Sequence, residues 1–203
     1  MNKQQVLEKV KKFVLQWIPS DDIHGYGHTE RVFQMCLKIG QRLGANLFVL
    51  QLAALLHDIG RFHNTIHSKS TNHAEISAEI ASDYLQTLNF KFNQNDLENI
   101  IHCIKAHSFS YNILPKTLEA KILSDVDKLD ALGAIGLYRT IGHTTKLNGN
   151  IEDVITHLKS KIFKLKDHLF LDISKEIAQK RYEIINQFYS EIKNEFKLDA
   201  STC

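Results

Sequence analysis

The sequence predicts an all-α protein, and three observations support this. Apolar residues recur at helical spacing along most of the 203 residues, which is the pattern of helices that bury one face. Only 2 prolines and 9 glycines interrupt the chain, so long helices are favoured. Segments with the strict apolar–polar alternation of strands do not reach a convincing length.

The boundaries of the helices are expected at turn-forming residues. Pro19 follows the first helix, Gly44 ends the second, and Pro115 precedes a helix that is expected to run towards Tyr138. A break around Gly149 precedes the last two helices. The predicted helices lie at about residues 3–17, 28–44, 47–57, 73–88, 95–107, 117–138, 151–164 and 173–196.

The segment from Leu47 to His57 differs from the other helices because it is apolar nearly all round. A helix without a polar face is expected to be buried at the centre of a domain. Asp58 and Gly60 follow it directly, and the polar residues 61–72 are expected to form a loop.

Composition excludes several classes of protein. The formal charge is +2 and the basic residues are spread along the chain, so dedicated nucleic-acid binding is not expected. The 3 cysteines form no CxxC pair, which argues against a disulfide framework or a thiolate zinc site and favours a reducing, cytoplasmic location. No segment has the length and apolar character of a membrane span or a signal peptide, and no membrane partner is expected.

The dipeptide His57-Asp58 at the end of the apolar helix is the first candidate for chemistry. Two polar side chains are costly to bury there without partners, although the pair alone could also be an ordinary helix end. His28 in the first turn of one helix, and Asp127 in a helix otherwise lined by apolar residues, could meet them in a bundle core. Imidazoles with carboxylates suit Mn, Fe, Ni or Zn ions better than calcium.

The order of these residues resembles the HD superfamily of metal-dependent phosphohydrolases, in particular small stand-alone bacterial and archaeal HD hydrolases. The motif-bearing core is expected at about residues 21–140, with C-terminal helices 150–198 packed on it to form a single HD domain over residues 1–203. The matching segments are His24-x-x-x-His28-x-x-Arg31-Val32, LAALLHDIG ending at Gly60, His73-Ala-Glu-Ile-Ser-Ala, His107-Ser-Phe-Ser, and Asp125-Val-Asp127-Lys-Leu-Asp130.

The resemblance implies a metal site made by His28, His57, Asp58 and Asp127. Asp127 is preferred because members of the family place this ligand in an Asp-x-Leu setting, and Asp125 remains the alternative, or orients a ligand. The expected cofactor is a divalent ion (Mn, Fe, Ni, Co, Zn or Mg), and a second ion is compatible with the pattern.

Catalytic roles are assigned to His24, Asp58 and Lys128. In cyclic-nucleotide phosphodiesterase relatives the histidine matching His24 donates a proton, but close relatives carry an aspartate where this chain has Gly25.

Substrate contacts are assigned to His73 and His107, which match positions that hold a second metal or touch phosphate, and to the cations Arg31 and Arg61. The alternatives are helix caps for the histidines and solvated charges for the cations, and Arg31 could instead pair with Glu30 or Asp58.

The resemblance therefore predicts hydrolysis of a phosphate bond in a nucleotide or related ester by water that the metal activates, with nucleotide pyrophosphohydrolase activity as the leading form. The expected partner is a small phosphate substrate, and a homodimer through the C-terminal helix is compatible with the pattern. One alternative is an HD-type sensor module that binds metal or nucleotide without catalysis. A di-iron oxygenase is a further alternative.

Overall fold

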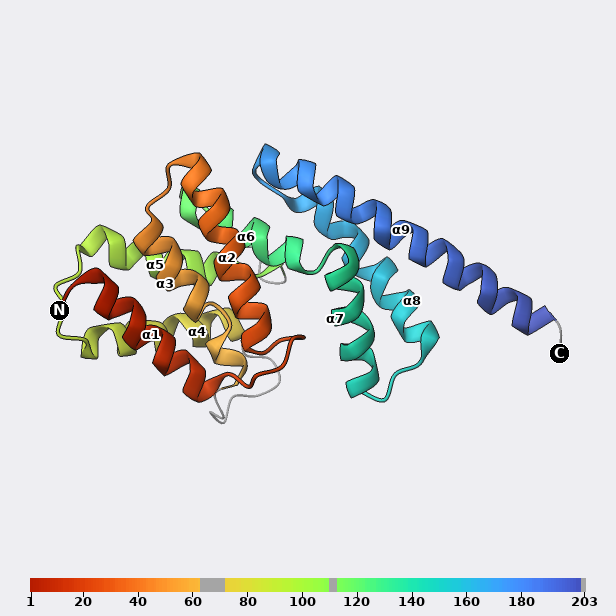
Figure 1. Cartoon of the computed structure of the whole chain (residues 1–203), viewed down its shortest axis with the longest axis horizontal. Helices are drawn as coiled ribbons and strands as arrows, with labels where there is room; N and C mark the ends of the chain where they lie inside the picture. The colour runs from red at the N-terminus through yellow and green to blue at the C-terminus, as the bar shows by residue number, and fades with distance from the viewer. Residues whose placement is uncertain (63–71, 110–112, 202–203) are drawn as a thin grey trace. The chain divides into compact units, whose positions relative to one another are not determined.

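The computed structural model describes residues 1–62, 72–109 and 113–201, with side chains as far as residue 196 (Figure 1). Every regular element within these ranges is a helix, which confirms the prediction of an all-α fold. The chain forms two compact units, residues 1–127 and 128–203. The single domain expected over residues 1–203 stays a prediction.

The first unit is built around α3 (Leu47–Leu56), which confirms the expected central helix. Almost all of its side chains are buried. The helices α1, α2 and α5 pack against it (Figure 1). The other elements of this unit are α1 (Lys3–Trp17), α2 (Tyr26–Leu43), η1 (Ile59–Arg61), α4 (His73–Thr87), α5 (Gln94–Ala106) and most of α6 (Leu118–Asp130).

Asparagine side chains cap the N-termini of several helices. Asn46 accepts a hydrogen bond from the Val49 amide at the start of α3, and Asn72 accepts one from the Ala74 amide at the start of α4. Such caps satisfy amides that have no partner inside the helix. The cap at Asn72 fixes the first turn of α4, where His73 lies. The helices that begin after Asn2, Asn93 and Asn150 are capped in the same way.

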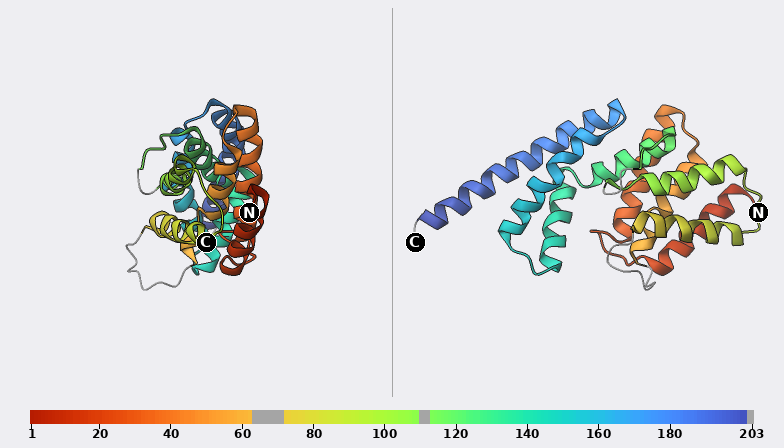
Figure 2. Two further views of the ribbon diagram at one scale, coloured as in Figure 1. Left: turned by 90° about the vertical axis from the view of Figure 1, so that its left-hand side faces the viewer. Right: turned by 180° about the vertical axis from the view of Figure 1, so that it is seen from behind.

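The second unit contains the end of α6, α7 (Gly133–Lys146), α8 (Ile151–Ser160), η3 (Ile162–His168) and α9 (Asp172–Ser201). Within this unit α7 packs against α8 and α9, and the long α9 extends beyond both (Figures 1 and 2).

The helix expected over residues 117–138 is wrong in one respect, because the structure divides it into α6 and α7. The chain passes through Gly133 with a φ of 76°, a left-handed conformation that ends a right-handed helix and that glycine adopts without strain. The α6–α7 turn is held by Arg181, which donates to the Leu129 carbonyl, and by an ion pair of 2.8 Å between Arg139 and Asp130. The predicted helix at 151–164 likewise ends at Ser160 and continues as the 3-10 helix η3.

The remaining sequence expectations concern cysteines, a loop and membranes. Cys36 and Cys103 are free and buried, whereas Cys203 lies outside the described residues. Most of the loop predicted at 61–72 also lies outside them. Within the described ranges, no helix combines the length and the apolar composition that a bilayer span would need.

Candidate metal centre

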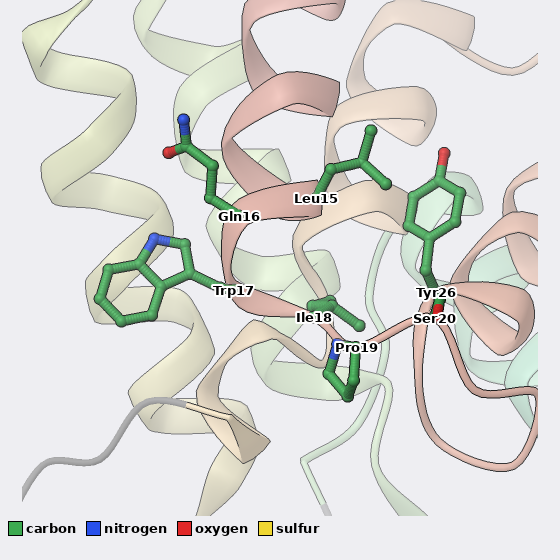
Figure 3. A pocket seen from close by; sticks show the side chains of 7 residues that line it. All are labelled: Leu15, Gln16, Trp17, Ile18, Pro19, Ser20 and Tyr26. Atoms are coloured by element: carbon green, nitrogen blue, oxygen red, sulfur yellow. The ribbon is translucent and has the colours of Figure 1, made fainter.

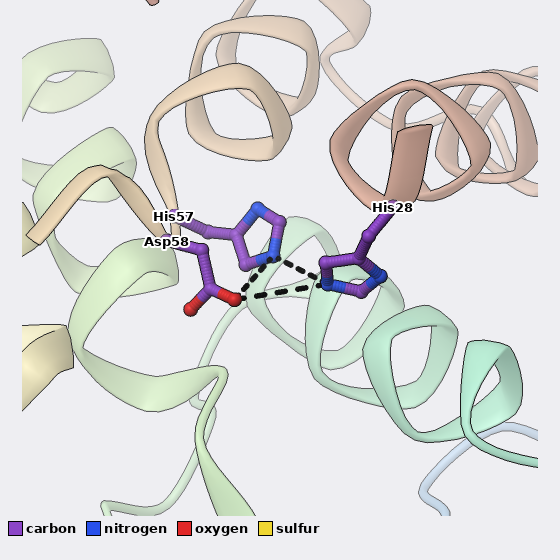
Figure 4. Close-up of side chains that lie close together, drawn as sticks. All are labelled: His28, His57 and Asp58. Carbon is purple, nitrogen blue, oxygen red and sulfur yellow. Dashed lines mark hydrogen bonds and ion pairs between the residues drawn. The ribbon is translucent and has the colours of Figure 1, made fainter. Parts of the chain in front are cut away.

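A group of buried polar side chains lies where α3 ends. His57 is the C-terminal cap of α3, and Asp58 precedes the 3-10 helix η1. His57 is 0% exposed and Asp58 is 2% exposed. His28, from the first turn of α2, is also fully buried. Figure 4 shows these three side chains directed toward one another.

The separations within this group suit a single cation. The Nε2 atoms of His28 and His57 lie 3.3 Å apart, and each lies 3.8 Å from Oδ2 of Asp58. Ligand atoms about 2.1 Å from a tetrahedral metal ion are separated by roughly 3.4 Å. The three side chains could therefore hold a metal ion between them.

The ring of His57 is oriented for metal binding. Its Nδ1 lies 2.8 Å from the Ala54 carbonyl oxygen. A carbonyl can only accept, so Nδ1 carries the hydrogen and Nε2 keeps its lone pair. Burial lowers the pKa of His57 to about 4. The imidazole is therefore neutral at pH 7, which is the form that binds metals.

Asp127 on α6 brings a second carboxylate to the group. Its Oδ1 lies 3.3 Å from Nε2 of His28, and its side chain is 24% exposed. Burial raises the pKa of Asp127, but the hydrogen bond and charge of His28 lower it by more than burial raises it. The net pKa therefore lies well below the usual range. The carboxylate is therefore ionised beside His28, and its role as a fourth ligand stays a prediction. Asp125, the alternative ligand, is fully buried two residues earlier.

The other oxygen of Asp58 faces a second pair of histidines. Oδ1 lies 3.4 Å from Nε2 of His73 and 3.4 Å from Nε2 of His107. The Nδ1 of His107 donates to the Ile104 carbonyl at 2.6 Å, so its Nε2 also keeps a lone pair. Asp58 Oδ1 and His107 Nε2 are buried without a hydrogen-bond partner among the described residues. Buried atoms in this state are typical of a site for an ion or ligand.

Arg61 on η1 lies against both Asp58 and His73. Its Nε is 2.7 Å from Asp58 Oδ2, and its Nη2 is 2.8 Å from His73 Nε2. Burial raises the pKa of Asp58, but the Arg61 charge and the neighbouring histidines hold it well below its usual range. Burial and the Arg61 charge lower the pKa of His73 to about 3. Asp58 is therefore ionised and His73 is neutral, and these are the protonation states in which the two side chains can face a cation.

Gly60 allows η1 to lie close to α4. Its amide donates to Ser77 Oγ at 2.9 Å. A Cβ at this position would lie 2.6 Å from the His73 carbonyl oxygen and 2.7 Å from the Ser77 amide nitrogen. Only glycine leaves room for this contact, so Gly60 fixes the separation between Asp58 and His73. The sequence indicated only that Gly60 lies beyond the end of a helix.

The loop before α2 carries His24 and is ordered by Asp21. One oxygen of Asp21 accepts hydrogen bonds from the amides of Ile23, His24 and Gly25 at 2.8, 3.1 and 3.2 Å. A Cβ on Gly25 would lie 2.3 Å from the Pro19 carbonyl oxygen, so the loop has no room for a side chain there. Asp21 was not singled out from the sequence, although aspartate before a helix is typical of such turns.

Arg31 also binds this loop. Its Nη2 donates to the carbonyl oxygen of Asp22 at 2.8 Å, and its Nη1 lies 3.5 Å from the Asp22 carboxylate. The sequence had suggested Glu30 or Asp58 as acidic partners, so Asp22 is a partner that was missed. A phosphate contact by Arg31 stays a prediction.

Lys128 follows Asp127 on α6 and belongs to the second unit. Its side chain is buried, and its Nζ lies 5.6 Å from the centre of the Phe170 ring. Its assignment to the reaction stays a prediction.

A pocket of about 430 Å³ lies at the end of α1, lined by residues 15–20 and Tyr26 (Figure 3). None of the predicted site residues lines it, and it does not belong to the histidine–aspartate group.

An all-helical bundle with a buried histidine–aspartate group defines a class of proteins whose interior can hold a divalent ion. The HD domain model matches residues 25–132, more than half of the chain, and the chain therefore belongs to the HD domain family. The predicted family and the HD-domain bundle are thereby confirmed.

Proteins that match this chain over nearly its full length indicate which members of the family it resembles. The chain is 28% identical over 215 residues to the uncharacterized protein YpgQ of Bacillus subtilis, covering 100% of both chains. The crystal structure of B. subtilis YpgQ in complex with ADP has a TM-score of 0.75 and 25% identity, with 96% of this chain and 97% of that chain covered. An HD-superfamily hydrolase of Bacillus thuringiensis has a TM-score of 0.71 and 26% identity, with 97% and 99% covered. The chain is similar to YpgQ-like HD-superfamily hydrolases.

Proposed function

We propose that this protein is a metal-dependent phosphohydrolase that cleaves phosphoanhydride or phosphoester bonds in nucleotides. The observation that carries the proposal is the convergence of His28, His57 and Asp58, whose ligand atoms lie within 4.8 Å of one another in the bundle interior. Buried polar groups are costly unless they are paired or bind an ion. A divalent ion is the group that this set of donors fits.

His28, His57, Asp58 and Asp127 would hold the ion. Their imidazole and carboxylate donors fit Mn, Fe, Co, Ni or Zn ions, and Mg less well. When bound, such an ion lowers the pKa of a water molecule from about 16 towards 7 and neutralises charge on a phosphate oxygen.

The chain's own residues would bind and position the phosphate. Arg61 lies at Asp58 and presents a guanidinium, which can bind phosphate through two hydrogen bonds. His73 and His107 face the same carboxylate and would line the place where the phosphate binds. His24, in the loop that Asp21 orders, would donate a proton to the leaving oxygen. Lys128 and Arg31 would add positive charge.

The nucleotide part of the proposal is supported by the relative from B. subtilis, YpgQ, which was crystallised with ADP. Phosphate-bond cleavage in such a site depends chiefly on positioning and charge, and the guanidinium of Arg61 and four imidazoles lie around Asp58. Cleavage of a nucleoside triphosphate to a monophosphate and pyrophosphate is the form of the reaction that we propose first.

A nucleotide panel tests this proposal. The purified protein is incubated with nucleoside mono-, di- and triphosphates in the presence of Mn²⁺, Co²⁺, Ni²⁺ or Mg²⁺, and phosphate and pyrophosphate are measured separately. We expect hydrolysis that requires the metal, with pyrophosphate as the product from triphosphates. Protein with nearly one bound metal per chain but no turnover of any phosphate ester would instead favour a sensor module.

A further inference from the structure

The two carboxylate oxygens of Asp58 face two different groups of possible ligands. Oδ2 faces His28 and His57, and Oδ1 faces His73 and His107. Both groups, taken with Asp58, have the separations of a metal site. Arg61 contacts Asp58, which both groups share, and it also contacts His73, which belongs only to the second group.

The guanidinium of Arg61 contacts two of the three side chains in this second group. Its Nε lies 2.7 Å from Asp58 Oδ2, and its Nη2 lies 2.8 Å from His73 Nε2. We propose that Arg61 is the resident cation of the Asp58–His73–His107 group, so that the protein binds one divalent ion, at His28, His57 and Asp58. This inference rests on the metal site of the proposed function.

The first argument is the lone pair of His73. An imidazole nitrogen has one lone pair, and guanidinium nitrogens can only donate. The Nε2 of His73 therefore accepts its hydrogen bond from Arg61 and cannot bind a metal at the same time. Without His73, only Asp58 Oδ1 and His107 Nε2 remain in this group, which is fewer than the ligands of a typical protein metal site.

The second argument is charge. A guanidinium remains protonated throughout the pH range in which proteins are folded. A divalent ion bound to His73 and Asp58 would lie beside it and be repelled. An ion at the first group would also lie near this charge, because Arg61 Nε is 2.7 Å from Asp58 Oδ2. The first group nevertheless keeps its carboxylate donor, since Oδ2 has more than one lone pair and can accept from Arg61 while it binds an ion.

The position of Arg61 is fixed by its neighbours. It follows Asp58 by three residues on η1, and η1 is held close to α4 through Gly60 and Ser77. A phosphate oxygen that reached Asp58 would meet the divalent ion on one side and the guanidinium on the other. Arg61 would thus supply the charge that a second ion supplies in a two-metal site.

Counting bound metal tests the inference. Wild-type protein and Arg61→Met are equilibrated with Mn²⁺ by dialysis, and manganese is measured by mass spectrometry against protein concentration. We expect about one ion per chain for the wild type and about two for Arg61→Met, because methionine keeps an unbranched apolar stem but has neither the charge nor the hydrogen-bond donors of arginine. In Arg61→Met/His107→Ala the second ion should be lost. Arg42→Met, at an exposed position near the end of α2, removes the same charge and should keep one ion.

Two ions per chain in the wild type would overturn the inference whatever the variants do. So would a folded Arg61→Met protein, with wild-type circular dichroism, that still binds one ion. If Arg61→Met does not fold, the wild-type count decides. The count needs no turnover, so its failure is distinct from that of the proposed function: two ions with hydrolysis contradict only this inference, and one ion without hydrolysis contradicts only the activity.

Discussion

Asp58 gives one carboxylate oxygen to each of two pairs of histidines, and Arg61 contacts the same carboxylate. Leaving a buried charge without a partner is costly. The guanidinium compensates the carboxylate within the protein itself, while Nε2 of His57 stays available because its Nδ1 is hydrogen-bonded to a backbone carbonyl. The orientation of single atoms, rather than residue types alone, makes this a candidate metal centre.

The Asp58→Ala variant tests the role of that carboxylate. We expect the variant to lose bound metal and to lose turnover by more than about 100-fold, since even residues that only support metal ligands contribute 10- to 100-fold. Metal content after gel filtration and the rate of nucleotide hydrolysis are the measurements. Asp83→Ala, at an exposed position on α4, is the matched control and should match the wild type. Full activity of Asp58→Ala in excess metal would contradict the assignment.

The stability of the metal-free protein should depend on pH through His57. Its pKa is lowered from 6.5 to about 4 by burial, so between these values the unfolded chain binds a proton that the folded chain does not. Stability therefore falls as the pH falls through this window, by about 3 kcal/mol from this residue. The lowered pKa of Asp58 acts in the same direction, but only near and below its ordinary value of 3.8.

Urea unfolding between pH 7 and pH 4.5 measures this dependence. The His57→Gln variant removes the titrating group and should show a shallower loss of stability with acid. His73, which also has a lowered pKa, is present in both proteins and does not affect the comparison. Equal slopes for the two proteins would show that His57 is protonated in the folded state.

Part of this site could be predicted from the sequence. His57 and Asp58 were identified because they are adjacent at the end of an apolar helix, and His28 and Asp127 because of their order along the chain. The contact of Arg61 with His73 could not be predicted, because the two residues are 12 positions apart in the sequence and meet only through the packing of η1 against α4. The contact between Arg31 and Asp22 could not be predicted either. It joins a helix to an irregular loop, and an irregular loop has no periodic pattern from which its conformation can be inferred.

At the scale of helices, the centre depends on how closely η1 lies against α4. Gly60 makes this approach possible because any side chain would collide with the backbone of His73 and Ser77. The cap at Asn72 fixes the first turn of α4, which carries His73. The site is therefore positioned by two helix ends that contact each other.

The Gly60→Ala variant should separate these helix ends. The added methyl group would lie 2.6 Å from a backbone oxygen, so we expect a loss of about 1–3 kcal/mol in stability and weaker metal binding. Gly44→Ala is a suitable control, since Gly44 has a φ of 70° but open space around its Cα. It should cost about 1 kcal/mol through backbone strain and leave metal affinity unchanged. Unfolding midpoints and Mn²⁺ titrations measure both effects, and equal metal affinities for the two variants would contradict the argument.

Most helices could be predicted within a few residues because each buries one apolar face. The exception was the single helix expected across residues 130–133, where apolar residues continue at helical spacing through the turn. A helical period does not show where the backbone becomes left-handed. Gly133 was the available signal, but a glycine alone does not reveal that its φ is 76° or that Arg181 packs beside it.

At the scale of the whole molecule, metal binding should contribute to stability, because the proposed ligands come from α2, the end of α3 and α6. An ion at 100 times its dissociation constant stabilises the folded state by about 2.7 kcal/mol. For a chain of this size the melting temperature should rise by roughly 5–10 °C. Calorimetry with and without Mn²⁺ measures the rise, and Asp58→Ala should abolish it. A rise of equal size in that variant would show that the ion binds elsewhere.

Packing of the C-terminal helices on the core and formation of a homodimer both remain predictions. The size of the protein in solution, measured by light scattering at several concentrations, tests the second.

The shared carboxylate also constrains how a gene of this kind can diverge. Because both oxygens of one aspartate face a pair of histidines, a substitution at position 58 alters both halves of the centre at once. Asparagine would keep one oxygen but lose the charge that both halves share. A relative without an acidic residue at this position is therefore expected to have lost the centre as a whole.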